Sequence, residues 1–208
     1  MQIIILANQS LKDELLSKGV QPEAELIWVG APADFLNYPT AFACIDLLFD
    51  NSPERLRILE QISVPVIINS VAYTLKETNP AFVRINGWNS FLQSEIVEAA
   101  ATTEEARQRA EAVLAQFNKK VEWLADEPGF VTPRVISMII NEAFFALAEG
   151  VSSPTEIDTA MKLGTNYPYG PFEWADKIGV ENLALLLEKL SIGERRYEPA
   201  SLLMQKKK

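Results

Sequence analysis

The sequence predicts an α/β protein in two parts, a mostly parallel sheet domain followed by an all-helical C-terminal domain. From residue 1 to about 120, short apolar runs alternate with amphipathic ones, a pattern typical of parallel strands joined by helices. Beyond Pro128 the short apolar runs stop and helical periodicity takes over. With 208 residues, 48% of them hydrophobic, the chain is long enough to bury a substantial core.

The strands of the first domain are predicted from its apolar runs. In chain order, these runs cover residues 3–6, 25–29, 42–49, 64–68, 82–85, 96–97 and 121–124. The last of them is expected at an edge of the sheet. The opening MQIIILANQ has neither the positive charge nor the cleavage site of a signal peptide, so we expect it to form the first strand.

Three helices are predicted between these strands. The first covers residues 11–18. Ser52 and Pro53 give the second a start signal, because an N-cap is followed by a proline whose missing amide hydrogen is not needed in the first turn. The segment TTEE at 102–105 predicts a capping box at the start of the third.

The C-terminal domain is predicted to be helical throughout. Residues 131–149 form one long helix with so little polar face that it must be buried on several sides or against a second subunit. The segment SPTE at 153–156 predicts a capping box and a helix that begins at Pro154. Gly164 is the expected left-handed residue that ends this helix. A proline-rich turn at 167–171 then leads to a helix at 172–178.

We place the domain boundary near Pro128, which gives a first domain of residues 1–127 and a second of residues 128–208. Composition limits the partners of both. The formal charge is −9, whereas general nucleic-acid binding needs clustered lysine and arginine. No stretch has the apolar length of a membrane span. The charge leaves room for an anionic ligand such as coenzyme A in a local basic pocket.

The single cysteine, Cys44, lies in an apolar run and is expected in the core. It cannot form a disulfide within the chain, which fits a reducing cytoplasm. We therefore expect a cytoplasmic protein without nucleic-acid or membrane partners, and we predict no metal site.

Three segments carry a family resemblance. EPGFV at 127–131 and RYEPASLL at 196–203 resemble the domain hinge and the C-terminal ending of the 3-hydroxyacyl-CoA dehydrogenases. Residues 141–179 resemble their helical C-terminal domain, which is of the 6-phosphogluconate dehydrogenase C-terminal-like type. A looser match extends back to about residue 42. The resemblance implies a Rossmann-like first domain, here truncated, a homodimer formed through the C-terminal helices, and NAD-dependent oxidation of a 3-hydroxyacyl-CoA in fatty-acid metabolism.

The residues that the resemblance implies for catalysis are changed in this chain. The family has HFFNP, whose histidine takes the hydroxyl proton of the substrate, where this sequence reads NGWNS at 86–90. Asn86 can orient an oxygen but cannot act as a general base near neutral pH. The carboxylate that orients the family's histidine is kept as Glu98, and Asn89 keeps the family's asparagine. A pair of Glu98 and Asn86 is a hydrogen bond and not a proton relay.

The positions that contact substrate in the family are also changed. The family's serine after S-N-T falls on Val71, or on Ser70 if the gap is placed differently. The asparagine before the hinge arginine is replaced by Pro133, which has no side-chain amide to polarise a carbonyl. The resemblance therefore leaves Ser70 and Arg134 as substrate-binding residues.

The coenzyme fingerprint is missing. The diphosphate of a dinucleotide needs G-x-G-x-x-G after the first strand, since glycines let the backbone approach the phosphates. The corresponding segment is ANQSL at 7–11, and the first glycine of the chain is Gly19. We therefore expect no cofactor, although NAD serves the family, and we assign no cofactor-binding residue.

Three functions are compatible with these observations. The first is a family member that has lost NAD-dependent hydride transfer and retains at most an acyl-CoA-like ligand. The second is an active oxidoreductase on a 3-hydroxyacyl-CoA or a related 3-hydroxy acid, with Glu98 as an unconventional base. The third is a non-catalytic dimeric binding or regulatory protein that uses the helix 131–149 as its interface.

Overall fold

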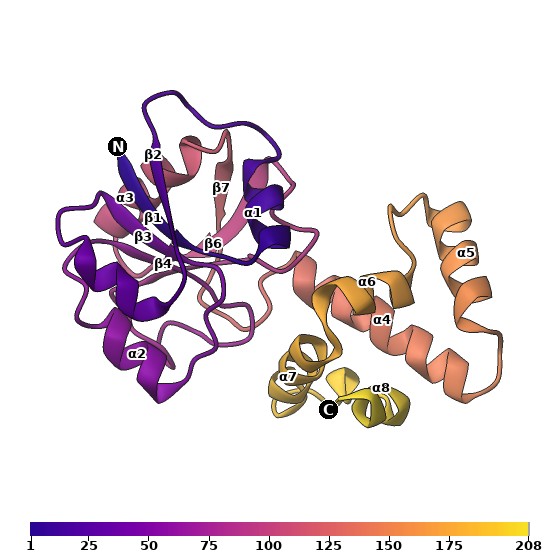
Figure 1. The fold of residues 1–208 in the computed structure, drawn as a ribbon. Helices are drawn as coiled ribbons and strands as arrows, with labels where there is room; N and C mark the ends of the chain where they lie inside the picture. Colours follow the sequence, from indigo (N-terminus) through magenta and orange to yellow (C-terminus); the bar gives the residue numbers. More distant parts are fainter. Residues whose placement is uncertain (208) are drawn as a thin grey trace. The chain divides into compact units, whose positions relative to one another are not determined.

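The computed structural model describes residues 1–207 and divides the chain into two compact units (Figure 1). The first is Met1–Phe130 and the second Val131–Lys208. This division falls slightly after the boundary that we expected near Pro128. Each unit is described by itself below.

The first unit contains a seven-stranded sheet in the order β2-β1-β3-β4-β5-β6-β7. All neighbouring strands are parallel except β5 and β6, which are antiparallel. The open, mostly parallel sheet predicted from the sequence is therefore confirmed, and β7 lies at an edge as expected. The strands are β1 (Gln2–Leu6), β2 (Glu25–Val29), β3 (Ala43–Asp46), β4 (Val66–Asn69), β5 (Val83–Ile85), β6 (Ile96–Ala100) and β7 (Lys120–Trp123).

The strand order is that of a doubly wound sheet without its outermost strand on one side. A full sheet of this kind runs 3-2-1-4-5-6, whereas here β2 is the last strand and the chain crosses from it directly to β3. The crossing contains only the short helix η1 (Pro32–Asn37). The winding direction reverses between β1 and β3, so their carboxyl ends mark the place where such folds bind ligands.

Two helices of this unit, α1 (Gln9–Leu16) and α3 (Glu104–Ala115), share one hydrophobic cluster with the sheet. The third, α2 (Pro53–Leu59), contacts η1 and contributes no residue to that cluster. Helix α1 begins two residues earlier than predicted because the Asn8 side chain accepts a hydrogen bond from the Leu11 amide (2.9 Å) and caps it. Helices on both faces of the sheet bury its apolar strands, which is the layered arrangement expected of an α/β fold.

The predicted starts of α2 and α3 have different outcomes. The Ser52 N-cap is confirmed, since its hydroxyl accepts from the Arg55 amide (3.2 Å). The capping box at 102–105 is wrong. Thr103 is the N-cap and accepts from the Ala106 amide (3.2 Å), so no carboxylate occupies the reciprocal position, and the Thr102 hydroxyl donates to the carbonyl of Pro80 instead.

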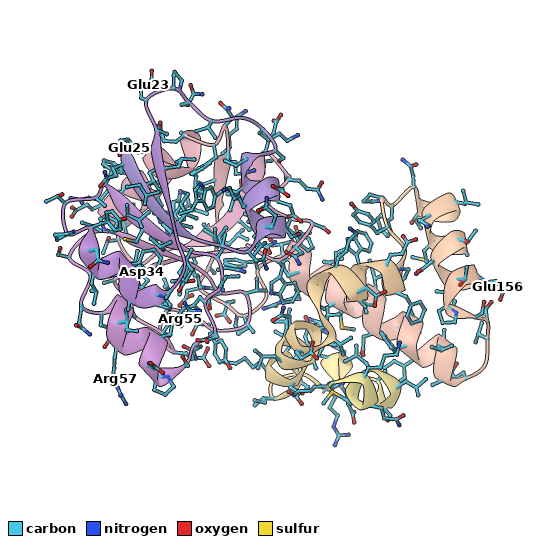
Figure 2. All side chains as sticks on the ribbon, viewed as in Figure 1. Glu23, Glu25, Asp34, Arg55, Arg57 and Glu156 are labelled. Carbon is cyan, nitrogen blue, oxygen red and sulfur yellow. The ribbon has the colours of Figure 1, made fainter. Side chains whose placement is uncertain are left out.

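The carboxyl end of β3 buries a carboxylate. Asp46 is fully buried, its Oδ1 accepts from the Leu48 amide (3.1 Å) and its Oδ2 lies 3.5 Å from Nη1 of Arg55. Arg55, which extends from α2 (Figure 2), also donates to the Leu48 carbonyl (2.8 Å) and lies 3.7 Å from Oδ1 of Asp50. Burial raises the pKa of Asp46 to about 6 against the attraction of Arg55.

The second unit consists of helices only. Its longest, α4, carries the buried Asn141, whose amide donates to the Glu198 carbonyl (2.9 Å) and accepts from the Ala200 amide (2.8 Å), so the C-terminal segment is tied to this helix. No helix within residues 1–207 is both long and apolar enough to cross a membrane. The elements are α4 (Thr132–Ala148), α5 (Pro154–Thr165), α6 (Pro171–Ile178), α7 (Val180–Ser191), η2 (Arg195–Tyr197) and α8 (Ser201–Lys206).

The ends of α5 were predicted with unequal success. The helix begins at Pro154 with the expected capping box of Ser153. The expected end at Gly164 is wrong, because this glycine stays within the helix. Asn166 adopts the left-handed conformation (φ 57°) in its place; asparagine is one of the few residues that tolerate it.

A close contact joins α5 to α6. Asp158 of α5 is buried and accepts from the Phe172 amide (2.8 Å) in the first turn of α6. Gly170, the N-cap of α6, has no room for a side chain because a Cβ atom there would overlap the Asp158 side chain. Lys162 and Glu173 add an ion pair across the same corner (2.5 Å).

We expect Gly170→Ala to destabilise the second unit by about 1–3 kcal/mol, because the new methyl group displaces Asp158 from the amide that it caps. The matched control is Gly164→Ala, which meets nothing within 4 Å and should stabilise α5 by about 0.5–1 kcal/mol through helix propensity. Thermal and urea unfolding followed by circular dichroism measure both changes. Equal effects of the two substitutions would contradict the packing described for Gly170.

We expect Asp46→Asn to stabilise the first unit above pH 6. The pKa of Asp46 is raised from 3.8 to about 6 in the folded protein, so the folded state binds the proton more tightly and loses stability as the pH rises from about 4 to 6. The variant lacks this loss, so its advantage in unfolding free energy should be near zero at pH 4 and on the order of 1–3 kcal/mol at pH 8.

Asp50→Asn is the control for this experiment. Burial of Asp50 is outweighed by hydrogen bonds from Ser52 and by the charge of Arg55, which lower its pKa. This carboxylate therefore stabilises the fold above its unfolded-state pKa, and its replacement should reduce stability at neutral pH. A parallel gain in both variants would contradict the opposite environments of the two groups.

Candidate functional site

Asn86 and Glu98 lie side by side at the carboxyl end of β5. The Asn86 main-chain amide donates to the Glu98 carbonyl (2.9 Å), and its side-chain Nδ2 donates to Oε2 of Glu98 (3.1 Å). Asn86 is buried, with 4% of its surface exposed, and Glu98 is half-buried. The antiparallel pairing of β5 with β6 produces this contact, because it sets the two residues opposite each other across the ladder.

The carboxylate determines how the Asn86 amide is oriented. An ionised carboxylate only accepts hydrogen bonds, so it faces the NH₂ group and not the amide oxygen. Oδ1 of Asn86 then points away from Glu98 and is buried without a hydrogen-bond partner among residues 1–207. The pair can hold and orient a polar group, but its asparagine offers no basic nitrogen to accept a proton.

Asn69 connects three strand ends around this pair. Its Nδ2 donates to the carbonyls of Leu47 (3.1 Å) and Gly87 (3.0 Å), and its Oδ1 accepts from the Gly87 amide (2.9 Å). A Cβ atom at Gly87 would come within 2.7 Å of the Asn69 side chain. Gly87 is therefore required for the close approach that fixes Asn86 next to the end of β4.

The segment after Asn86 is held by two charged groups from outside it. Both carboxylate oxygens of Glu14 accept from the Ser90 amide (2.7 and 2.9 Å), and Ser90 has a left-handed backbone (φ 81°). The buried ammonium of Lys119 donates to the carbonyls of Leu92 and Ser94. Burial lowers the pKa of Lys119 to about 8. Asn89, immediately before the anchored Ser90, is half-buried.

Ser70 serves the local turn in this structure. It is 3% exposed, and its hydroxyl donates to the Tyr73 carbonyl (2.9 Å). Arg134 belongs to the second unit, where its guanidinium carbon lies 6.0 Å from the centroid of the Tyr197 ring. The structure thus brings Asn86 and Glu98 together, with Asn89 in the segment that follows, and it gives Ser70 and Arg134 other contacts.

A buried arginine that we did not predict as functional organises the segments behind the site. Arg84, in β5, is fully buried and its Nε lies 2.6 Å from Oδ1 of Asp126. Its other nitrogens donate to the carbonyls of Ser70 (3.1 Å), Val71 (3.4 Å) and Glu127 (2.6 Å). The sequence contained one signal for this network, a single arginine within the apolar strand FVRI. An arginine on a buried strand needs charged and hydrogen-bonding partners, because it is almost never fully buried without them.

The turn after β1 does not fit a dinucleotide. The Asn8 side chain occupies the Leu11 amide of the first turn of α1, and no glycine opens the backbone there. At the neighbouring end of β3, the carboxylates of Asp46 and Asp50 share one cation, Arg55. A diphosphate needs main-chain amides that the backbone can bring close to it and a positive field, whereas this turn has no glycine, a capped Leu11 amide and two carboxylates at the neighbouring strand end.

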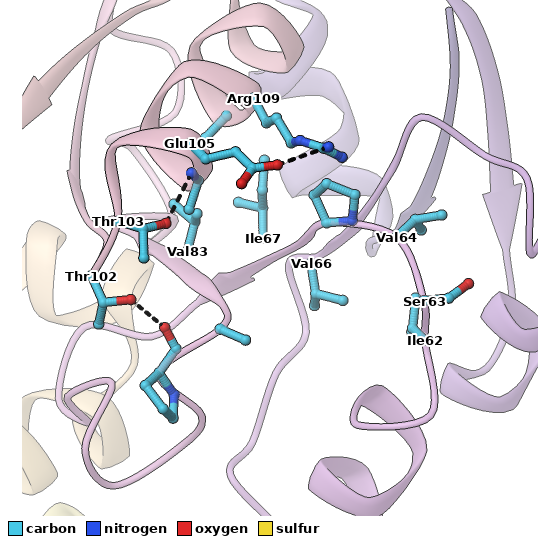
Figure 3. Close-up of a pocket in the computed structure, with 15 residues that line it drawn as sticks. Ile62, Ser63, Val64, Val66, Ile67, Val83, Thr102, Thr103, Glu105 and Arg109 are labelled. Carbon is cyan, nitrogen blue, oxygen red and sulfur yellow. Dashed lines mark hydrogen bonds and ion pairs between the residues drawn. The ribbon is translucent and has the colours of Figure 1, made fainter.

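One cavity of about 640 Å³ lies at the opposite, amino-terminal ends of β4 and β5 (Figure 3). Its walls are mainly aliphatic, with Val66, Ile67 and Val83 among them. Figure 3 shows Arg109 paired with Glu105 at its rim (3.0 Å), and the hydroxyls of Thr102 and Thr103 bonded to main-chain groups. None of the predicted site residues lines it, and no group of three or more potential metal ligands occurs within residues 1–207.

Comparison with known proteins identifies the C-terminal part of the chain. Residues 129–208 match the model of the 3-hydroxyacyl-CoA dehydrogenase C-terminal domain. The chain is 47% identical over 113 residues to the 3-hydroxyadipyl-CoA dehydrogenase of Escherichia coli (strain K12), which covers 53% of this chain and 24% of that protein. It is 39% identical over 111 residues to the probable 3-hydroxybutyryl-CoA dehydrogenase of Bacillus subtilis (strain 168), covering 52% of this chain and 39% of that protein.

Solved structures extend the likeness in fold to almost the whole chain. The (S)-3-hydroxybutyryl-CoA dehydrogenase of Ralstonia eutropha superposes with a TM-score of 0.76 over 98% of this chain and 92% of that one, at 22% identity. The alignments with the curated relatives span only 24% and 39% of those proteins. Residues 129–208 of this chain are therefore a C-terminal domain of the 3-hydroxyacyl-CoA dehydrogenase family.

Proposed function

We propose that this chain is a family member that binds an acyl-CoA-like ligand without transferring hydride to or from NAD. The observation that carries the proposal is the contact of Asn86 with Glu98, at the place where the family resemblance implies a histidine. Abstraction of a hydroxyl proton needs a group whose pKa lies near the working pH. An amide cannot supply it, and the neighbouring carboxylate already accepts the amide's hydrogen bond.

The turn after β1 supports the same proposal independently. Hydride transfer requires the nicotinamide to be held by its diphosphate, and the capped, glycine-free start of α1 beside two carboxylates opposes that. Two separate parts of the family's machinery are therefore altered in one domain. We place this binding role in the cytoplasm and close to fatty-acid metabolism; the coenzyme A thioesters in the names of the relatives support an acyl-CoA-like ligand.

An alternative is an active oxidoreductase on a 3-hydroxyacyl-CoA, and one observation favours it. Glu98 keeps a titratable carboxylate beside the buried Asn86, and carboxylates serve as general bases in many enzymes. This alternative requires a coenzyme contact different from the usual one. Turnover measurements separate it from our proposal.

We expect the purified chain to show no oxidation of NADH with acetoacetyl-CoA, and no binding of NAD by calorimetry. Asn86→His should not restore turnover, because the start of α1 still lacks the phosphate cradle. A thermal-shift series with NAD, NADP, coenzyme A and acetoacetyl-CoA then tests ligand binding. A ligand present at about a hundred times its dissociation constant stabilises by roughly 2.7 kcal/mol.

The outcomes of this experiment point in different directions. Stabilisation by a coenzyme A thioester, but not by NAD, supports the proposal. Turnover by the wild-type chain contradicts the proposal and supports the active oxidoreductase. Turnover that appears only in Asn86→His would mean that the coenzyme site is intact and that the base alone is lost.

We further propose that the chain forms a homodimer through its C-terminal helices. Helix α4 presents an apolar stripe to solvent, in which Val131 and Val135 are more than half exposed and Phe145 is 37% exposed. These residues lie on one face at helical spacing. Exposed apolar stripes of this kind commonly mark protein interfaces, and the same stripe suits the third candidate, a non-catalytic binding or regulatory dimer.

We expect Val135→Glu to abolish the association through the C-terminal helices, seen as a lower sedimentation coefficient at matched concentration, because it places a charge within the apolar stripe of α4. Ile192→Glu, which changes an 88% exposed residue beyond α7, is the control and should leave the sedimentation coefficient unchanged. A wild-type chain that stays monomeric at all concentrations would rule out this interface.

A further inference from the structure

The strand β2 presents an unprotected edge. Its neighbour β1 lies on one side only, since β2 is the last strand of the sheet. The Glu25 amide donates to the Met1 carbonyl (2.8 Å), so in this parallel pair Glu25, Ile27 and Val29 direct their main-chain groups toward β1. The amides and carbonyls of Leu26 and Trp28 point away from the sheet, and within residues 1–207 they have no hydrogen-bond partner on that side.

The usual protection of a sheet edge is missing here. Natural edges carry charged side chains, prolines or bulges that prevent pairing with another chain. The segment Leu26–Val29 has none of these, whereas the other edge strand, β7, exposes Lys120 and Glu122. The free edge is limited to this segment, because the next amide, that of Gly30, is already bonded to Oδ2 of Asp34 (3.1 Å).

The outward groups of β2 are self-complementary. Leu26 and Trp28 lie symmetrically about Ile27, so an antiparallel second copy centred on Ile27 sets Leu26 opposite Trp28 of that copy, and the reverse. Both become hydrogen-bonded pairs, and the two strands together gain four main-chain hydrogen bonds. A register shifted by two residues would leave one of these residues opposite a position outside the free segment.

The side chains agree with this register. Leu26 and Trp28 pack against the hydrophobic cluster beneath α1, and the Lys12 ammonium lies 4.4 Å from the centroid of the Trp28 ring. Across the proposed contact a leucine faces a tryptophan twice, which is a favourable cross-strand pair. Glu25 faces Val29 of the second copy, so no like charges lie opposite each other.

We propose that two copies of this chain pair along β2, antiparallel and centred on Ile27, to form one continuous sheet. This contact is separate from the C-terminal helices and from the Asn86 site. It uses the strand that would be covered in a sheet with the full doubly wound order. The two-fold symmetry explains why a second copy, and not an unrelated peptide, satisfies both outward residues at once.

Position-specific cross-linking tests the register directly. In the proposed pair Ile27 lies opposite Ile27 of the second copy at a non-hydrogen-bonded position, with Cα atoms about 4.5 Å apart, which is within the range for a disulfide of about 4.4–6.8 Å. We expect Ile27→Cys to give a covalent dimer under mild oxidation on a non-reducing gel. The native Cys44 is buried, which raises its pKa to about 12, so the wild type should not cross-link.

The matched control is Val29→Cys on the same strand. In this register it faces Glu25, and its own counterpart lies roughly 13 Å away along the strand, so it should stay monomeric on the gel. Cross-linking of both variants alike would mean random collision and would overturn the proposal. So would the absence of cross-linking in Ile27→Cys when its circular dichroism matches that of the wild type.

Further variants test the contact without any cross-linking chemistry. Ile27→Lys places two lysines directly opposite each other and should reduce association in sedimentation velocity at least tenfold, while Ile27→Thr should retain it. Adding Val135→Glu to Ile27→Cys should leave the cross-link in place, which distinguishes the β2 contact from the helical dimer. Loss of the cross-link in that double variant would assign the association to the helices and contradict the β2 contact.

Discussion

The hydrogen bonds and ion pair of Arg84 are the interaction on which the first unit depends. A fully buried guanidinium is tolerated only when its charge and its donors are matched, since an uncompensated buried charge costs several kcal/mol. Asp126 supplies the charge, and three carbonyls from two separate segments supply the remaining acceptors. The Phe130 ring covers the guanidinium at 4.1 Å. These partners draw the end of the unit back onto β5, which explains why the unit continues to Phe130 and does not end at Glu127.

The same arginine links the fold to the candidate site. Arg84 donates to the carbonyl of Ser70, which comes directly after Asn69 in the chain. The Asn69 side chain in turn hydrogen-bonds to both main-chain groups of Gly87, next to Asn86. The Asp126 carboxylate also accepts from the Leu75 amide (2.9 Å), which anchors the connection between β4 and β5. The position of Asn86 beside Glu98 is thus determined by a network of buried polar groups, and not by the two residues alone. Such networks are rigid when all members are satisfied.

Much of the fold could be predicted from sequence because it depends on local signals. Apolar runs located the strands, and the caps Ser52 and Ser153 located two helix starts. The pairing of Asn86 with Glu98 was predicted from a family resemblance, and the antiparallel ladder explains it. The failures concern choices between neighbours. Thr103 instead of Thr102 became a cap, because the Thr102 hydroxyl donates to the Pro80 carbonyl. Asn166 instead of Gly164 ended α5, since asparagine also tolerates the left-handed conformation.

Hydrogen-bond and ion-pair partners that lie far apart in the sequence could not be predicted. Arg84 and Asp126 are 42 residues apart, and Glu14 bonds Ser90 across 76 residues. No periodicity connects such positions. The order of the strands in the sheet could not be predicted either, because it also depends on contacts between distant segments. The exposed edge of β2 follows from the direct crossing to β3, which a list of predicted strands does not contain.

The distribution of titratable groups bears on which chemistry the first unit can support. The chain contains no histidine. Two groups have a pKa moved close to neutrality, with burial raising that of Asp46 to about 6 and lowering that of Lys119 to about 8. Both are used structurally, Asp46 by Leu48 and Arg55 and Lys119 by two carbonyls. Neither hydrogen-bonds to Asn86, so a perturbed pKa here reports the cost of burial and not preparation for proton transfer. The groups whose pKa would best suit a base are thus already engaged in structural contacts, which agrees with the binding role proposed above.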